Sequence, residues 1–295
     1  GNRELASIKE YVALYATYVD AIDRLSTAAS EYGETASDEA LADYEKYSNV
    51  DASNLDKAEL QALVDNIELT ICELRVPKAD GASDESPVEM TSVISNPSFE
   101  KDGAAASDGW TWNTKASGDT GVKDNSNDTY TIDRADGSYV FNTWNKDAVE
   151  GGYWLKQTLK ALPAGTYKLT AIVASDANNK IAIGANEKYG NEITLNTPKE
   201  EASDIETVFV VEEGQTEVEI KVASDTWFKA DNFQLWYYGK NSSNQPTGIE
   251  GAEAADSEAA AVSITTLNGV KVNSLVKGIN IITKANGEKV KVYVK

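Results

Sequence analysis

The residue types present decide which chemistry this sequence can support, and the most informative fact is that histidine is absent. The chain of 295 residues has no His, one cysteine (Cys72), and 48 Asp plus Glu against 27 Lys plus Arg. Without imidazole there is no Ser-His-Asp or Cys-His nucleophile, no imidazole acid-base catalysis and no His-ligated zinc or iron site. One cysteine also excludes disulfide frameworks and four-thiolate metal sites. A carboxylate-based enzyme, a binding module or a structural protein remains.

The charge balance narrows the range of partners. A formal net charge of -21 and a pI of about 4.4 would repel phosphate backbones, so we expect no nucleic-acid partner. No apolar run approaches the roughly 18 residues that would suggest a membrane span. Cys72 lies between Ile71 and Leu74 in a helical pattern, which favours an unreactive core thiol, because apolar burial raises the pKa of a thiol.

Three of the six tryptophans are predicted to point away from the core. Side chains alternate faces along a strand, so Trp154 shares a face with Lys156, Trp236 shares one with Gln234, and Trp144 lies near a loop. A pyranose ring can stack its C–H groups on an exposed indole while nearby amides and carboxylates bind its hydroxyls. We therefore predict Trp144, Trp154 and Trp236 as ligand contacts. The alternative is that the helical segment or the C-terminal module covers them.

Catalysis would have to use carboxylates alone. A glycosidase needs two acids about 5–5.5 or 6.5–9.5 Å apart. With 48 acids in the chain some pair will meet that spacing by chance, so the spacing has little discriminating power. The sequence has neither a Gly-rich phosphate loop nor a nucleophile elbow. We predict that the chain is not an enzyme.

The elements that must position these residues begin with helices in residues 1–75. Gly33 is predicted to end the first helix, and Ser53 with Asp56 resembles a capping box for the third. Three amphipathic helices with short connections predict a small all-α helical bundle. The predicted inward face of the first helix is spaced by three and four, namely Leu5, Ile8, Val12, Tyr15, Val19 and Ile22, and is widened by Tyr11, Leu14, Tyr18 and Leu25.

Residues 76–88 have linker composition, and residues 89–240 change to the alternating pattern of strands. Short strands divided by Asn, Asp and Gly clusters predict an all-β jelly-roll sandwich. The predicted strands are Thr91–Ser95, Trp110–Thr114, Tyr130–Arg134, Tyr139–Trp144, Tyr153–Leu159, Tyr167–Ser175, Lys180–Gly184, Glu206–Val211, Glu217–Val222 and Phe233–Tyr238. Alternation through the last strand and the residues just before it predicts that Phe233, Leu235 and Tyr237 share the core face with Asp231.

Residues 241–261 form a second linker, and residues 262–295 predict a small basic β-hairpin module. Asn268-Gly269 and Asn286-Gly287 are hairpin turn signals. From Val262 onward there are six Lys and one Glu, a charge of +5, which leaves -26 on the remainder. Such a module could dock on the acidic body of the chain. The alternative is that its lysines protect an edge strand.

The middle segment resembles the carbohydrate-binding-module-like jelly rolls, with a galactose-binding-domain-like fold, of secreted proteins from gut Bacteroidetes. The matching residues, in order, are Asn96-Pro97-Ser98-Phe99-Glu100, Gly109-Trp110, Gln157-Thr158-Leu159, Leu162-Pro163-Ala164-Gly165-Thr166-Tyr167, Asp231-Asn232-Phe233 and Tyr237-Tyr238-Gly239. The segment from Thr247 to Lys295 is similar to the short C-terminal β module common in the same exported proteins.

The resemblance implies a structural calcium site in which Glu100 and Asp231, from the first and last strands, supply oxygen ligands together with backbone carbonyls. A hydrogen-bonded or solvated carboxylate pair is the alternative. It also implies a secreted or cell-surface protein whose signal peptide is not part of this sequence. We therefore expect a non-catalytic exported protein that binds a glycan or polysaccharide. The alternatives are a structural or adhesin-like cell-envelope protein and, less favoured, a carboxylate-only glycosidase.

Overall fold

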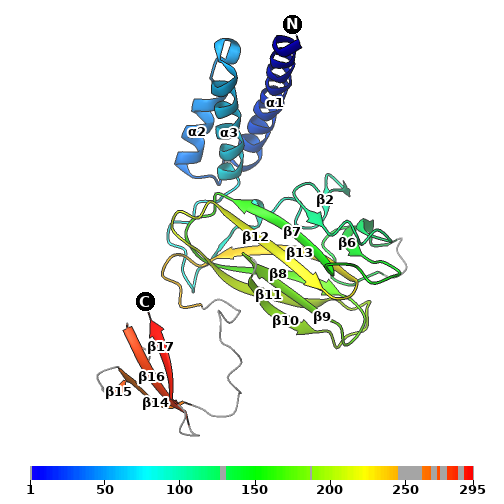
Figure 1. Cartoon of the computed structure of the whole chain (residues 1–295), viewed down its shortest axis with the longest axis vertical. Helices are drawn as coiled ribbons and strands as arrows, with labels where there is room; N and C mark the ends of the chain where they lie inside the picture. The colour runs from blue at the N-terminus through cyan, green and yellow to red at the C-terminus, as the bar shows by residue number, and fades with distance from the viewer. Residues whose placement is uncertain are drawn as a thin grey trace. The chain divides into compact units, whose positions relative to one another are not determined.

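The computed structural model describes residues 2–126, 131–186 and 188–244, and toward the C-terminus 261–266, 271–272, 278–284 and 289–294. The chain divides into two compact units, Gly1–Gly248 and Ile249–Lys295. Within the first unit, three α-helices precede a β-sandwich (Figure 1).

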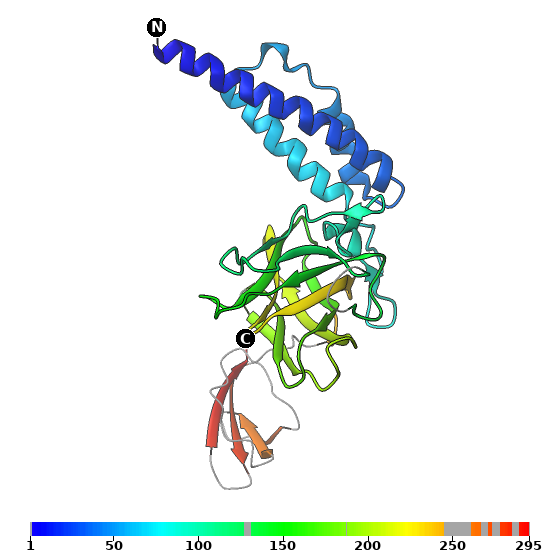
Figure 2. The ribbon, with the colours of Figure 1, turned by 90° about the vertical axis from the view of Figure 1, so that its right-hand side faces the viewer.

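The helical part comprises α1 (Asn2–Tyr32), α2 (Asp38–Ser48) and α3 (Lys57–Leu74), with a short 3-10 turn between α2 and α3. The longer helices α1 and α3 run side by side (Figure 2). Gly33 follows α1 as predicted, because a Cβ there would lie 2.4 Å from the Ala29 carbonyl oxygen. The predicted Ser53 cap is wrong. The side chain of Asp56 accepts hydrogen bonds from the first turn of α3, and Glu59 accepts one from the Asp56 backbone N–H in return.

The buried face of α1 is not the one that the 3–4 spacing predicted. Tyr11 and Tyr18 face the rest of the helical part, where their hydroxyls donate to the backbone carbonyls of Leu55 (3.0 Å) and Val50 (3.4 Å). Leu14, Ala21 and Leu25 pack on the same side. The predicted face is instead exposed along most of its length, at Leu5, Ile8, Val12, Tyr15 and Val19. The helix has two apolar stripes, and its neighbours cover only one.

The sandwich consists of two antiparallel sheets. One sheet has the order β11-β8-β13-β6-β5, with β1 also paired to β13, and the other has the order β10-β9-β12-β7-β4. Their strands are β1 (Val88–Glu89), β4 (Thr111–Trp112), β5 (Gly121–Asp124), β6 (Tyr139–Thr143), β7 (Tyr153–Lys160), β8 (Gly165–Ala174), β9 (Lys180–Ala185), β10 (Lys188–Thr194), β11 (Ser203–Val211), β12 (Glu217–Ser224) and β13 (Phe228–Tyr237). A small hairpin of β2 (Glu100–Lys101) and β3 (Ala104–Ala105) lies beside them, and the predicted strand at Thr91 is a 3-10 helix, Thr91–Val93.

An aromatic cluster forms the centre of the core between the two sheets. Phe99 is fully buried, with its ring centroid 5.4 Å from that of Trp110 and 5.8 Å from that of Phe141. Leucine, isoleucine and valine from the inner faces of both sheets surround the cluster. The predicted β-sandwich after a helical segment is therefore confirmed, and Trp110 is buried in its core. Trp112 is half-buried and packs on Phe141.

A β-bulge in β13 changes the predicted face of Asp231. The backbone of Asn232 has φ 51°, and the pairing with β8 shifts between Asp231 and Gln234. Asp231 pairs with Ile172, which lies in a small apolar cluster outside the main core, whereas Phe233 points into the main core. The predicted shared face for Asp231 and Phe233 is thus wrong, because the extra residue of a bulge reverses the alternation.

The second unit contains β14 (Ala261–Thr266), β15 (Lys271–Val272), β16 (Gly278–Lys284) and β17 (Lys289–Val294), which form one antiparallel sheet in the order β15-β14-β16-β17. The predicted Asn-Gly turns and most of the second linker lie outside the described residues. Docking of this module on the acidic body stays a prediction. No helix in the described part of the chain is both long and apolar enough to cross a membrane.

Candidate functional site

The structure places the three predicted ligand tryptophans at three separate positions on the sandwich. Trp154 lies on β7, between Tyr153 and Leu155, which point into the core, so its indole is on the outer face of that sheet. Trp236 lies on β13 of the other sheet, between the core residues Leu235 and Tyr237. These two tryptophans therefore face opposite sides of the molecule.

Trp144 is the most exposed of the six tryptophans, at 41%. It follows the last residue of β6, and by alternation it shares a face with Asn142, the outer face of the β13 sheet. Thr143 pairs with Phe228, at the start of β13, and Trp236 lies eight residues further along that strand. At about 3.3 Å per residue the two indoles are roughly 25 Å apart. No two of the three predicted tryptophans line one groove.

The backbone on both sides of Trp144 is held by the segment before β5. The N–H of Trp144 donates to Thr120 Oγ1 (3.1 Å), and its carbonyl accepts from the N–H of Asp119 (3.0 Å). A Cβ on Gly118 would lie 2.7 Å from the same carbonyl oxygen, so the segment passes too closely for any larger residue. The position of Trp144 is thus set by fixed backbone contacts.

Polar side chains lie near the backbone of Trp144. The Asp119 carboxylate pairs with Lys123 Nζ (2.5 Å) and accepts a longer hydrogen bond from the Asn142 side chain (3.3 Å). Both members of the Asp119–Lys123 pair are partly exposed. Asn145 follows Trp144 and is half-buried. An apolar ring with a carboxylate, a lysine and amides at one sheet edge can offer stacking and hydrogen bonding together.

The other two candidates are less accessible. Lysine ammonium groups lie over the ring of Trp154, with Lys156 Nζ 5.3 Å and Lys221 Nζ 5.6 Å from its centroid, so a ligand would have to displace them. Trp236 is half-buried and pairs with Lys168 of β8, whose ammonium is bound to Glu206 (2.6 Å).

The two carboxylates proposed for calcium are brought together by the loop before β6. Asp231 Oδ2 accepts from the N–H of Asp136 (2.7 Å), and Glu100 Oε2 accepts from the N–H groups of Ser138 (2.8 Å) and Tyr139 (3.1 Å). The Asp136 carboxylate accepts from the hydroxyl of Ser98 (2.5 Å). One short loop thus carries contacts to both predicted ligands.

Asp231 is an unusual carboxylic acid because it is completely buried and one of its oxygens, Oδ1, has no hydrogen-bond partner among the described residues. Its pKa is raised to about 8, mainly by burial and with a smaller contribution from the neighbouring carboxylates of Asp136 and Glu100, while backbone N–H groups partly oppose the shift. A cation beside Oδ1 would satisfy this oxygen and stabilise the charged form.

The side-chain ligands alone do not make a complete cation site. No group of three or more His, Cys, Asp or Glu side chains within the described ranges is arranged to hold a metal ion. Calcium takes about six to eight oxygens, including backbone carbonyls and water. The unpartnered Oδ1 fits a calcium ligand, and backbone carbonyls and water would have to supply most of the remaining ones.

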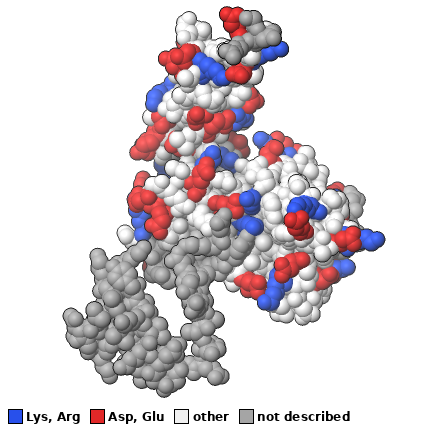
Figure 3. Space-filling model, viewed as in Figure 1, with Lys and Arg blue, Asp and Glu red and all other residues white. Residues whose placement is uncertain are grey.

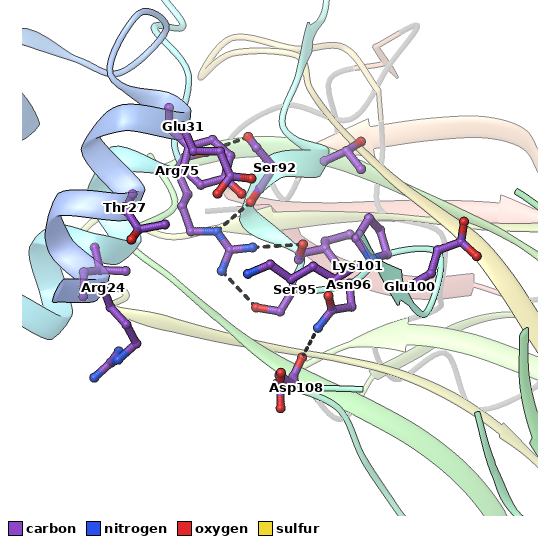
Figure 4. Close-up of a pocket in the computed structure, with 16 residues that line it drawn as sticks. Arg24, Thr27, Glu31, Arg75, Ser92, Ser95, Asn96, Glu100, Lys101 and Asp108 are labelled. Atoms are coloured by element: carbon purple, nitrogen blue, oxygen red, sulfur yellow. Dashed lines mark hydrogen bonds between the residues drawn. The ribbon is translucent and has the colours of Figure 1, made fainter. Parts of the chain in front are cut away.

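A cavity of about 680 Å³ lies where the helical part meets the sandwich (Figure 4). Arg75 extends from the end of α3 and donates to the carbonyls of Ser92 (2.8 Å) and Ile94 (3.1 Å) and to Ser95 Oγ (2.9 Å). Arg24, on another wall, is paired with Glu68. Both guanidinium groups already have hydrogen-bond partners within the protein. We therefore interpret this cavity as a polar contact region between the helical part and the sandwich.

On the face shown in Figure 3, the charges of the described residues do not mark one strongly charged site. Acidic side chains are distributed over the visible face of the molecule, with lysines and arginines between them (Figure 3). Cys72 is partly buried, and burial raises the pKa of its thiol. Its lack of reactivity stays a prediction.

No protein-family model and no curated protein matches this sequence. The solved structures that resemble part of this chain include carbohydrate-binding modules and segments of glycan-degrading enzymes. TmCBM61 in complex with beta-1,4-galactotriose is 23% identical, with 49% of this chain and 97% of that chain covered and a TM-score of 0.37. The CBM22-1 xylan-binding domain of Paenibacillus barcinonensis Xyn10C is 13% identical (50% and 94% covered, TM-score 0.33). A family 35 module from Clostridium thermocellum is 15% identical (41% and 93% covered, TM-score 0.29).

The sequence reasoning missed the residues that accompany the predicted ones. Asp119 and Lys123 are four residues apart, in a segment that gave no strand signal, and only the β5–β6 pairing brings them beside Trp144. Asp136 was missed although the Asp136-Gly137 pair is a turn signal that places a backbone N–H and a carboxylate in a loop.

Proposed function

We propose that this chain binds a glycan without catalysing its breakdown, and that Trp144 is the main stacking surface. The observation that carries the proposal is the 41% exposure of this indole on a backbone fixed at both sides. A rigid aromatic ring loses little conformational freedom on binding, and a sugar ring can cover it with C–H groups. Asp119, Lys123 and Asn145 supply hydrogen-bonding groups for its hydroxyls.

The similarity of the fold to carbohydrate-binding modules supports this choice of ligand class. We also propose that the protein acts outside the cell, where polysaccharides are available. Trp154 and Trp236 remain proposed contacts, each for a separate sugar, because they face opposite sides of the sandwich.

A glycan array followed by calorimetry on the best hit tests the proposal. The wild-type chain should bind at least one glycan, and Trp144→Ala should weaken that binding at least tenfold, about 1.4 kcal/mol. Trp154→Ala is the comparison variant and should change the affinity for this glycan by less than about twofold, because Trp154 lies on the other sheet and would contact a separate sugar. Absence of any glycan signal would refute the binding function. If only Trp154→Ala loses glycan binding, the binding site lies on the sheet that contains β7 and not at Trp144.

We further propose that Asp231 and Glu100 hold a structural calcium ion, with Asp231 Oδ1 as a ligand. Asp231 Oδ1 is buried and has no hydrogen-bond partner among the described residues. An unpaired buried polar atom destabilises the folded state, and a bound cation would remove this cost. The ion would join the last strand to the hairpin of β2 and β3, and would compensate the repulsion between the two carboxylates.

Thermal unfolding in calcium chloride and in EDTA tests this metal site. Calcium should raise the melting temperature of the wild type, and Asp231→Asn should remove the difference. Asp65→Asn, which changes an exposed carboxylate on α3, should keep the full calcium effect. An equal response of wild type and Asp231→Asn would eliminate the proposed ligand.

A further inference from the structure

The strongest unexplained feature of the first unit is an apolar stripe on α1. It consists of Leu5, Ile8, Val12, Tyr15 and Val19, whose exposed fractions run from 38% to 61%. The described part of the chain has seven exposed large hydrophobic side chains, and five of them belong to this stripe. A contiguous exposed apolar patch of this kind marks an interaction surface more often than a chance exposure.

The spacing of the stripe is that of a coiled-coil seam. Its members are separated alternately by three and four residues, and Ile22, half-buried, continues the same series by one further step. A seam with this period packs against a second helix by knobs-into-holes contacts. Apolar surface on the sheets of a sandwich would not match such a narrow, regular stripe. The chemistry of the stripe therefore points to an apolar helix as its partner.

The size of the stripe is compatible with a reversible homodimer. From the exposed fractions, the stripe leaves roughly 400–500 Å² of apolar surface per copy, within the range of about 300–600 Å² for the largest patch of a monomer. Two copies together would bury about 800–1,000 Å² of this apolar surface, less than the roughly 1,200–2,000 Å² of stable interfaces and in the range of weak, transient ones. The expected association is thus weak and concentration-dependent.

The direction of the two helices follows from the position of the sandwich. Arg75 and the cavity beside it join the sandwich to the end of the helical part where α1 finishes, and the start of α1 points away from it (Figure 1). Parallel pairing would bring both sandwiches to the same end, beside helices whose axes are about 8–10 Å apart. Antiparallel pairing places the sandwiches at opposite ends.

We propose that two copies of this chain associate through their α1 stripes as an antiparallel helix pair. In this pairing Leu5 of one copy lies opposite Ile22 of the other, Ile8 opposite Val19, and Val12 opposite Tyr15. Each of these facing pairs combines two different side chains. The bulky Tyr15 packs against the smaller Val12, and this pairing fills the interface better than two facing tyrosines would.

Sedimentation velocity of the full chain, from about 1 to about 200 µM, tests the association. The wild type should change from monomer to dimer over this range, and Val12→Lys should stay monomeric throughout. Leu69→Lys is the matched control, because Leu69 is 46% exposed on α3 and lies off the stripe. Circular dichroism checks that both variants keep their helices. A wild type that stays monomeric, or an equal loss of dimer in both variants, would overturn the proposal.

Disulfide trapping tests the direction. In a Cys72→Ala background, chains with Ile8→Cys mixed with chains with Val19→Cys should form a cross-linked heterodimer under mild oxidation, because their Cα atoms would lie within the range of about 4.4–6.8 Å. Ile8→Cys alone should stay uncross-linked. Efficient cross-linking of Ile8→Cys with itself would contradict the antiparallel arrangement.

Discussion

The β-sandwich and the helical part of this chain bury their apolar residues to very different extents. Of the seven exposed large hydrophobic side chains of the described residues, six lie on α1 and α3 and only Trp144 lies on the sandwich. Two facing sheets cover each other's inner surfaces completely, whereas α1 has neighbours on one side only. An exposed aromatic ring on the sandwich is therefore exceptional and supports the proposed glycan contact, and the exposed stripe on α1 supports the proposed dimer.

The two parts can be observed separately in solution. All six tryptophans lie in the sandwich segment, and all three long helices precede it. Tryptophan fluorescence thus reports unfolding of the sandwich, and far-ultraviolet circular dichroism reports mainly the helices. Each variant below changes one part or the connection between them.

The largest effect is expected from Phe99→Ala, which removes the centre of the sandwich core. Phe99 is fully buried and contacts Trp110, Phe141 and Phe233. Large-to-small changes of this kind cost about 3–5 kcal/mol of unfolding free energy. The unfolding free energy of the sandwich, measured by denaturant unfolding with tryptophan fluorescence, should fall by this amount. If the helical signal shifts equally, the two parts unfold as one cooperative unit, and the contrast between them does not extend to stability.

Arg75→Ala should have an intermediate effect, because it breaks the connection between the parts and leaves both cores intact. The guanidinium makes three hydrogen bonds to the segment before β2, and the hydroxyl of Ser92 donates to the Arg75 carbonyl in return. Loss of charged hydrogen bonds costs about 1.5–3 kcal/mol. We expect the fluorescence and dichroism transitions to move apart. Transitions that stay superimposed would show that another contact joins the two parts.

Asp231 gives the sandwich a pH dependence that extends to about pH 8. With calcium removed, its pKa of about 8 in the folded state lies above its ordinary value, so the folded state holds a proton that the unfolded state has lost. The contribution of Asp231 therefore lowers stability as pH rises toward 8, by about 2 kcal/mol between pH 6 and pH 8. The chain has no histidine to obscure this range.

Fluorescence-monitored unfolding in EDTA at pH 6 and pH 8 measures this dependence, and Asp231→Asn should abolish it. Added calcium should reduce it in the wild type, because the ion favours the charged carboxylate. If Asp231→Asn keeps the full pH dependence of stability, the proton that the folded state holds belongs to another group.

The smallest effect is expected from Asp56→Ala, which removes the capping box of α3. Asp56 accepts hydrogen bonds from the N–H groups of Ala58 and Glu59. Loss of such a cap costs about 1 kcal/mol. The dichroism transition should shift and the fluorescence transition should not. A shift of both signals would indicate that the start of α3 also supports the sandwich.

Much of the sandwich could be predicted because alternation of side chains is local. The core positions of Tyr153, Leu155 and Leu159 on β7 follow from it directly. The prediction failed for Asp231, since one residue with positive φ at Asn232 reverses the alternation and gives no clear signal in the residue types. The companions of Trp144 could not be predicted for another reason, because they become neighbours only through the pairing of β5 with β6.

For the helical part the sequence determined that helices form and where apolar residues recur, since both depend on residues within one or two turns. It did not determine which of the two apolar stripes of α1 would be buried. That choice belongs to the tertiary structure, because the hydroxyls of Tyr11 and Tyr18 find backbone carbonyls only on the side where the connection before α3 passes. Absence of histidine limited the chemistry from the start, and packing then left the Trp144 indole and one stripe of α1 exposed.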